Sequence, residues 1–345
     1  ASGAVSSRVM SHLEGQQQLV WSDGTMTPTT RVPDPVAPLP HGVPRYRTSL
    51  QSTNFRLNHT RRIWSDHAAL VAGLLAASVG FIVFNCLLFG TFQDGLSRLD
   101  WEFIVSSSSR VADKAGIRHA LLGSIWLLVL PTLFIIPIGI GAAVYNEEYL
   151  PPGRLRRFLD LNIANAAAIP SILYGIIGLA IFVRGFESIT GGRSILSGSV
   201  VMAIIALPIL IISVKASLRT VPEDLRQAAY AVGMTRSQMV WTVVLPEAFP
   251  GIVTGTLLSL SRIVGETSAL LAMGALAFVS YAPSLSLEGL QSSFTTIPIQ
   301  IYFWAIHPQE GFRANAAASV IVLGSLVLAM NMGAVLLKDI YRRRY

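Results

Sequence analysis

The sequence predicts an all-α integral membrane protein with six transmembrane helices. Of its 345 residues, 52% are hydrophobic and only 13% are charged, which is about half the charged fraction of a typical soluble domain. The apolar residues form six stretches, each near or above the roughly 20 residues that a helix needs to cross a bilayer. These stretches lie at about 68–92, 119–145, 159–183, 195–217, 247–281 and 314–337.

The fifth stretch is too long for one upright span, so it must tilt, bend or leave the membrane at one end. Pro170 is expected to bend the third span. Close helix packing is expected at Gly139 and Gly141 of the second span and at Gly251 and Gly255, which open the fifth.

Basic residues mark alternate ends of these stretches. They precede the first stretch, separate the second from the third and the fourth from the fifth, and end the chain: Arg56, Arg61, Arg62; Arg154, Arg156, Arg157; Lys215, Arg219, Arg226, Arg236; Lys338, Arg342, Arg343 and Arg344. The other loops carry fewer basic residues, diluted by acidic ones. Because Lys and Arg favour cytoplasmic loops, both termini are predicted to be cytoplasmic. The net charge of +7 therefore reflects membrane topology, and no nucleic-acid partner is expected.

Residues 1–64 form a polar, Pro-containing tail that we expect to be cytoplasmic and disordered, and residues 65–345 form the membrane domain. Prolines in VPDPVAPLP (32–40) oppose helix formation. The first apolar stretch begins only after about 65 residues and is long enough to span, unlike a signal peptide. The lone cysteine, Cys86, lies inside an apolar stretch, so neither a disulfide nor a metal site is expected.

One amphipathic segment, 222–246, separates the fourth and fifth stretches. Its first half places an apolar stripe at helical spacing: Leu225, Ala228, Ala229 and Val232. Pro222 suits the first helical position, and Glu223 and Asp224 complement the helix dipole. Gly233 is expected to end this helix as a C-cap residue does.

A second short helix is expected after Gly233. Thr235 and Gln238 fit a capping box at its start. Its apolar side would comprise Met239, Val240, Val243 and Val244. Pro246 is expected to close the unit. Two short helices around a glycine, on a cytoplasmic loop, are typical of a docking surface for a soluble partner.

Two charges interrupt the fifth stretch, Arg262 and Glu266. They are four residues apart, which predicts a shared helix face, with Ser259 close to it. Each costs on the order of 3 kcal/mol or more in a membrane unless it is paired or hydrated. Arginine offers a planar set of donors that suits a tetrahedral oxyanion. Glu266 could hold Arg262 or select a protonated anion, and a purely structural ion pair is the alternative.

The segment 222–246 resembles the EAA loop of ABC importer permeases. The matching positions are Gln227, Ala228, Ala229, Gly233, Val243, Leu245 and Pro246. Gln227 stands where the family usually has an acid. The resemblance implies that an ATPase docks at Glu223, Gln227, Ala228, Ala229, Gly233, Leu245 and Pro246.

Four further motifs resemble the PstA type of phosphate importer permease: RIVGETSALL (262–271), IPSILYGIIGLAIFV (169–183), YNEEYLPPGR (145–154) and IPIQIYFWA (297–305). Together the resemblances cover about 65–345. They imply the six-helix fold of type I ABC importer permeases in a bacterial cytoplasmic (inner) membrane. They also make Arg262, Glu266 and Thr267, with Ser259, candidates for an anion pathway.

The resemblance further implies a set of partners. These are a second permease of the PstC type, two copies of an ATPase of the PstB type and an extracytoplasmic phosphate-binding protein of the PstS type. The chain has no GxxxxGK[ST] motif, so it is expected to be non-catalytic and to bind no cofactor, while the ATPase uses ATP and Mg²⁺. Two alternatives stay open: an ABC permease for sulfate, molybdate or phosphonate, and an ion-coupled secondary transporter, which inverted repeats and several intramembrane carboxylates would favour.

Overall fold

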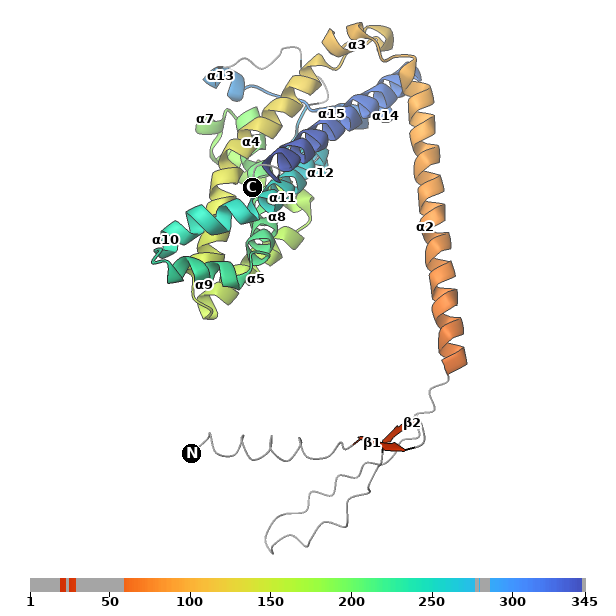
Figure 1. The fold of residues 1–345 in the computed structure, drawn as a ribbon. Coiled ribbons are helices and arrows are strands. Elements are labelled where there is room, and N and C mark those ends of the chain that lie inside the picture. The colour runs from red at the N-terminus through yellow and green to blue at the C-terminus, as the bar shows by residue number, and fades with distance from the viewer. Residues whose placement is uncertain (1–18, 23–24, 29–58, 277–278, 280–285, 343–345) are drawn as a thin grey trace, which may run out of the picture. The chain divides into compact units, whose positions relative to one another are not determined.

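The computed structural model describes residues 19–22, 25–28, 59–276, 279 and 286–342 (Figure 1). The chain divides into two units, Ala1–Leu70 and Val71–Tyr345. In the first unit, β1 (Leu19–Ser22) and β2 (Thr25–Pro28) pair as an antiparallel hairpin. The disordered tail was predicted for residues that lie mostly outside the described ranges, so it stays a prediction.

The other described elements are helical. In chain order they are α2 (His59–Leu96), α3 (Trp101–Val105), η1 (Ala112–Lys114), α4 (Arg118–Val144), η2 (Tyr145–Tyr149), α5 (Arg154–Ala168), α6 (Ser171–Gly178), η3 (Leu179–Gly185), α7 (Glu187–Thr190), α8 (Ile195–Arg219), α9 (Glu223–Ala231), α10 (Arg236–Met239), η4 (Val240–Val244), α11 (Leu245–Gly265), α12 (Ser268–Ala272), α13 (Leu287–Leu290), α14 (Ile297–Ala305) and α15 (Gly311–Arg342). Three of them, η2, η3 and η4, are π-helical turns.

Five continuous helices are long and apolar enough to cross a membrane. They are Asp66–Leu96, Arg118–Tyr149, Ile195–Arg219, Arg236–Gly265 and Gly311–Ile340. A sixth span results if the bent pair Arg154–Ala168 and Ser171–Gly185 is counted as one. These spans confirm the predicted all-α membrane fold and fall on the six apolar stretches.

The core of the second unit forms where α8 packs along α4 and α11 (Figure 1). Two glycines of α11 permit close approach: a Cβ on Gly251 would lie 2.5 Å from Ser217 Oγ, and one on Gly255 would lie 2.6 Å from Ser213 Cβ. The predicted small-residue contact at the start of the fifth span is therefore confirmed. The similar expectation for Gly139 in α4 is confirmed, because a Cβ there would lie 2.6 Å from Leu210 Cδ2. The expectation for Gly141 is wrong, because no described residue of another element lies within 4 Å of a Cβ there.

The third apolar stretch is broken at Pro170. Helix α5 ends at Ala168, and α6 leaves at an angle of 91°. The residue before a proline is disfavoured in a helix, which explains the position of the break. Tyr174 fixes the bend, because its hydroxyl donates a 2.8 Å hydrogen bond to the carbonyl of Ala166 in α5. The predicted bend at Pro170 is confirmed.

The fifth stretch is broken as well, directly after Gly265. The helical rod begins at Arg236 and ends at Gly265, and Glu266 has an extended backbone before α12. The expectation that Pro246 ends the preceding unit is wrong. Pro246 is the second residue of α11, just after the wider π turn η4, and the helical rod continues through it.

The contact between α11 and α8 is testable through its glycines. We expect Gly255→Ala to destabilise the protein by about 1–3 kcal/mol, because the added methyl overpacks against Ser213. Gly141→Ala is the matched control and should be neutral or stabilising by up to about 1 kcal/mol, since alanine favours a helix. Thermal unfolding of the purified protein in detergent measures both. Equal melting temperatures for the two variants would contradict the predicted packing.

Candidate functional site

The segment 222–246 forms the predicted helix–glycine–helix unit. Gly233 has a φ of +84°, a left-handed conformation that glycine adopts without strain. The N–H of Gly233 donates to Tyr230 O at 2.9 Å, and that of Met234 donates to Ala229 O at 3.1 Å. This pair of bonds is a Schellman C-cap, so the predicted role of Gly233 is confirmed. Pro222 lies one residue earlier than expected, at the N-cap of α9.

The second helix of the segment starts with the predicted capping box. Thr235 N–H donates to Gln238 Oε1 at 2.9 Å, and Gln238 N–H donates to Thr235 Oγ1 at 3.4 Å. On the apolar side of this helix, Met239, Val240 and Val244 are fully buried. The second helix is thereby anchored to the core, and the prediction for it is confirmed.

The apolar stripe of α9 is mostly uncovered. Ala229 is buried, but Val232 is 74% exposed and Leu225 is also exposed. Tyr230, which the sequence reasoning did not single out, adds a third large exposed side chain. Leu225 and Val232 are seven residues apart and share a helix face, whereas Tyr230 lies on a different side of α9. The exposed face of Leu225 and Val232, the α9 surface, has the apolar character of a docking site.

The other predicted docking residues divide into two groups. Glu223, Gln227 and Ala228 are exposed on α9, beside the α9 surface. Leu245 and Pro246 are half-buried in the first turn of α11, and Leu245 packs against the core. Leu245 and Pro246 therefore lie on the core side of the segment and do not contribute to its exposed face.

An ion-pair cluster joins this segment to the rest of the domain, and the sequence reasoning missed it. Arg226 of α9 donates to Glu148 Oε1 at 2.9 Å, and both side chains are largely buried, at 13% and 6% exposed. The same guanidinium donates to the carbonyls of Leu218 and Val221 at 2.9 and 2.6 Å. Glu148 lies in η2 at the end of α4, so one side chain of α9 binds groups from two neighbouring elements.

The rest of the cluster gathers around Glu147 and Lys215. Glu147 pairs with Arg156 of α5 at 2.5 Å and with Arg219 of α8 at 2.9 Å. Lys215 donates to Asn146 and forms an ion pair with Asp160 of α5. Two sequence signals mark the cluster: the acidic pair in YNEEY at the end of an apolar stretch, and a lysine inside another apolar stretch.

The predicted anion residues lie at the break between α11 and α12. Arg262 is exposed beside a depression of about 550 Å³. Its lining residues are Ile209, Leu258, Ser261, Arg262, Gly265 and Glu266. The structure thus brings Arg262 and Glu266 to the same depression. An exposed guanidinium on an otherwise mainly apolar lining is able to bind an anion.

The shared helix face predicted for Arg262 and Glu266 is wrong, because the helix ends between them at Gly265. Among the described residues, no ion pair joins these two side chains. Glu266 instead accepts hydrogen bonds from Ser268 Oγ at 2.6 Å and from the N–H of Ala269 at 3.4 Å. Its carboxylate therefore caps the start of α12.

A hydroxyl chain connects this cap to the other helix break. Ser268 Oγ lies 2.8 Å from Ser171 Oγ, in the first turn of α6 directly after Pro170. Of the other predicted pathway residues, Thr267 is half-buried at the N-cap of α12. Ser259 is fully buried and donates to the carbonyl of Thr256 at 2.7 Å. Ser259 therefore does not line the depression.

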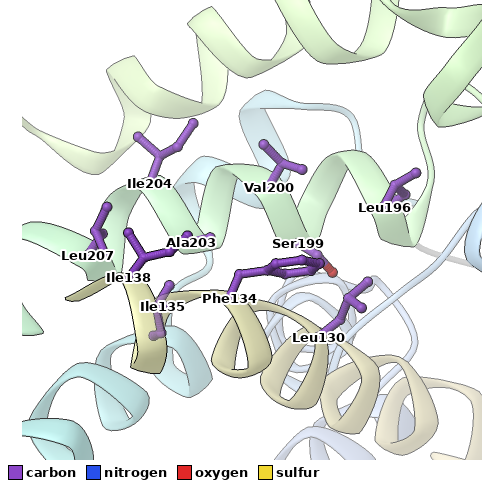
Figure 2. Close-up of a pocket in the computed structure, with 10 residues that line it drawn as sticks. All are labelled: Leu130, Phe134, Ile135, Ile138, Leu196, Ser199, Val200, Ala203, Ile204 and Leu207. Atoms are coloured by element: carbon purple, nitrogen blue, oxygen red, sulfur yellow. The ribbon is translucent and has the colours of Figure 1, made fainter. Parts of the chain in front are cut away.

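A second hollow, between α4 and α8, has a different character (Figure 2). Its volume is about 330 Å³. It is lined by Leu130, Phe134, Ile135, Ile138, Leu196, Ser199, Val200, Ala203, Ile204 and Leu207. Ser199 supplies its one side-chain hydroxyl, and no charged group lines it. The hollow therefore suits a hydrocarbon ligand and offers no binding group for an anion.

Comparison with known proteins identifies relatives of this chain. Residues 135–345 match the family described as "Binding-protein-dependent transport system inner membrane component". The "Probable ABC transporter permease protein YqgI" of Bacillus subtilis (strain 168) is 31% identical over 77% of this chain and 90% of its own length. The "Phosphate transport system permease protein PstA" of Pasteurella multocida (strain Pm70) is 29% identical over 83% of this chain and 97% of its own length.

A solved structure confirms the fold. The chain matches one from a "bacterial alginate ABC transporter in complex with alginate pentasaccharide-bound periplasmic protein" with a TM-score of 0.57. The two are 17% identical, over 79% of this chain and 96% of the other. At that level of identity the likeness establishes the fold alone.

The cap at Gly233 is testable by local stability. We expect Gly233→Ala to loosen the end of α9 by about 1–2 kcal/mol, because a Cβ strains the left-handed conformation. Hydrogen exchange of the α9 amides measures the change. Gly233→Asn is the control and should exchange more slowly than the alanine variant, since asparagine tolerates this conformation better. Unchanged protection in Gly233→Ala would contradict the assigned cap.

Proposed function

Because this chain belongs to the family of inner membrane components of binding-protein-dependent transport systems, we propose that it is one permease subunit of an ATP-driven phosphate importer. It is a non-catalytic, multi-pass membrane subunit that forms half of a translocation pathway. The main support for an anionic substrate is Arg262, a cation exposed at a depression within the apolar domain. Phosphate in particular is supported by the similarity to permeases named for phosphate transport.

Arg262, in this proposal, binds the anion as it passes through the membrane. Its guanidinium offers donors that match two oxygens of a tetrahedral anion. Glu266 is held by Ser268 and the N–H of Ala269, so its carboxylate is fixed near the passing ion. An acceptor at this position favours a phosphate that still carries a proton, since such an ion can donate a hydrogen bond.

The α9 surface docks a cytoplasmic ATPase. Leu225 and Val232 expose apolar side chains on a helix whose other side is held to the core. Removal of apolar side chains from water at an interface contributes favourable binding free energy. The termini and this segment are placed in the cytoplasm, where the positive-inside rule puts them.

The proposal extends to the other subunits that the resemblance to phosphate importer permeases implies. A second permease of the PstC type completes the pathway, and two ATPase copies of the PstB type bind ATP and Mg²⁺. An extracytoplasmic protein of the PstS type delivers phosphate. Closure of the ATPase pair moves the segment 222–246, and the helices then expose Arg262 alternately to the two sides of the membrane.

The first prediction from this proposal concerns the anion. The reconstituted complex should import phosphate in an ATP-dependent way and should discriminate against sulfate and molybdate. Arg262→Ala should lower phosphate uptake by roughly 10–100-fold, because a hydrogen bond to a charged group contributes about 1.5–3 kcal/mol. Uptake of radiolabelled phosphate into proteoliposomes measures the effect.

Arg262→Lys is the matched variant, since it keeps the charge but loses the planar set of donors. It should retain more uptake than Arg262→Ala. Preferred uptake of sulfate or molybdate by the unchanged protein would contradict the proposed substrate. Uptake that follows an ion gradient without ATP would contradict the importer class. Full phosphate uptake by Arg262→Ala would remove Arg262 from the pathway.

A further prediction concerns docking. Val232→Glu should reduce retention of the ATPase during purification by about tenfold, because it places a charge in an apolar contact that would leave it desolvated. Val111→Glu is the control, an exposed valine at η1 outside the 222–246 segment. Co-purification of the ATPase measures both. Equal retention in the two variants would contradict docking at α9.

A further inference from the structure

The side chain of Arg226 is held by more partners than the stability of a short surface helix requires. Its guanidinium binds Glu148 of η2 and two carbonyls at the end of α8, those of Leu218 and Val221. The ion pair with Glu148 is largely buried, with the two side chains 13% and 6% exposed. Loss of one member of a buried pair leaves the other charge unpaired, which is strongly unfavourable. Arg226 thus fixes α9 to the ends of α4 and α8.

The π-helical turn η2 connects α9 to two further helices, α5 and α8. Glu147 and Glu148 are adjacent in η2, yet they bind different elements: Glu148 binds α9, whereas Glu147 binds Arg156 of α5 and Arg219 of α8. Lys215 of α8 also binds α5, through Asp160. A displacement of η2 by α9 must therefore displace α5 or break the ion pair between Glu147 and Arg156.

Helix α5 leads directly to the anion depression. Tyr174 of α6 donates to Ala166 near the end of α5, which fixes the 91° bend between the two helices. Ser171, in the first turn of α6, contacts Ser268, which donates to Glu266 at the depression. A series of hydrogen bonds and ion pairs, joined by the backbone of η2, α5 and α6, thus runs from α9 to Glu266.

We propose that the buried ion pair between Glu148 and Arg226 is the coupling contact through which movement of α9 reaches α5 and the anion depression. Both side chains are positioning residues, since neither lies at the depression or on the α9 surface. The inference rests on the proposed docking of an ATPase at α9. A contiguous network alone does not establish coupling, so the pair must be tested by its energetic interaction.

A double-mutant cycle tests the proposal in the reconstituted complex with its ATPase. The variants are Glu148→Gln, Arg226→Gln and the two combined, and the readout is phosphate imported per ATP hydrolysed. We expect each single variant to lower this ratio by about tenfold, and the combined variant to lower it no further, because contacting residues act non-additively. A purely structural role would lower the amount of assembled complex and leave the ratio unchanged.

Two further variants complete the design. Glu247→Gln is the control: Glu247 is an exposed acid in the first turn of α11, and it should keep the original ratio. Arg226→Lys keeps the charge but cannot reach Glu148 and both carbonyls together, so it should fold and lower the ratio to an intermediate value. If the glutamine variants fail to assemble, Arg226→Lys is the variant that tests the coupling role.

The outcomes separate the two proposals. Single variants with an unchanged ratio, an additive loss in the combined variant, or an unchanged ratio in Arg226→Lys would each overturn the coupling role while leaving ATPase docking in place. Failure of the unchanged protein to retain an ATPase would overturn the docking and the coupling role together. A lowered ratio with a non-additive cycle supports both.

Discussion

A charged side chain that leaves water for an apolar interior has to be paired, and this requirement determines how the ends of α4, α5, α8 and α9 meet. Desolvation costs several kcal/mol per ion, so Glu147, Glu148 and Lys215, all nearly buried, each need an opposite charge or a strong donor or acceptor nearby. The partners come from α5, α8 and α9. The helices cannot slide past one another without separating these pairs. The cluster therefore sets their relative positions more strictly than apolar packing alone, which tolerates small shifts.

The two breaks inside apolar stretches obey a related constraint. A helix that ends inside a membrane domain exposes backbone groups that must find partners, because each unsatisfied group is costly there. At the first break, the Ala166 carbonyl accepts hydrogen bonds from Tyr174 and from the Ile169 N–H. At the second, the Glu266 carboxylate accepts the N–H of Ala269. The contact between Ser171 and Ser268 joins the two breaks, so irregular backbone is concentrated beside the Arg262 depression.

Local features of the sequence predicted local structure well. The bend at Pro170, the cap at Gly233 and the box of Thr235 depend on a few neighbouring residues, and each is confirmed. The prediction of a shared helix face for Arg262 and Glu266 was wrong because spacing by four assumes an unbroken helix, whereas the helix ends between them at Gly265. The glycine there is itself a local signal of a helix end. Glu148 and Arg226 lie 78 residues apart, so their pairing depends on the packing of whole helices. Sequence spacing carries no information about such a contact.

The helical rod from Arg236 to Gly265 gives the molecule a second connection between its two functional regions. At 1.5 Å per residue it is about 45 Å long, and it starts in the segment 222–246 and ends three residues beyond Arg262. In the proposed transport cycle, a tilt of its first turns moves Arg262 directly. In the proposed coupling, the Glu148–Arg226 pair acts on Glu266 through α5, α6 and Ser268. Arg262 lies within the rod, whereas Glu266 follows it and is also held by Ser268, so in this proposal unequal movement of the two connections changes the distance between cation and carboxylate. A change in that distance alters how strongly the depression holds an anion, which is the property that a transport cycle has to vary.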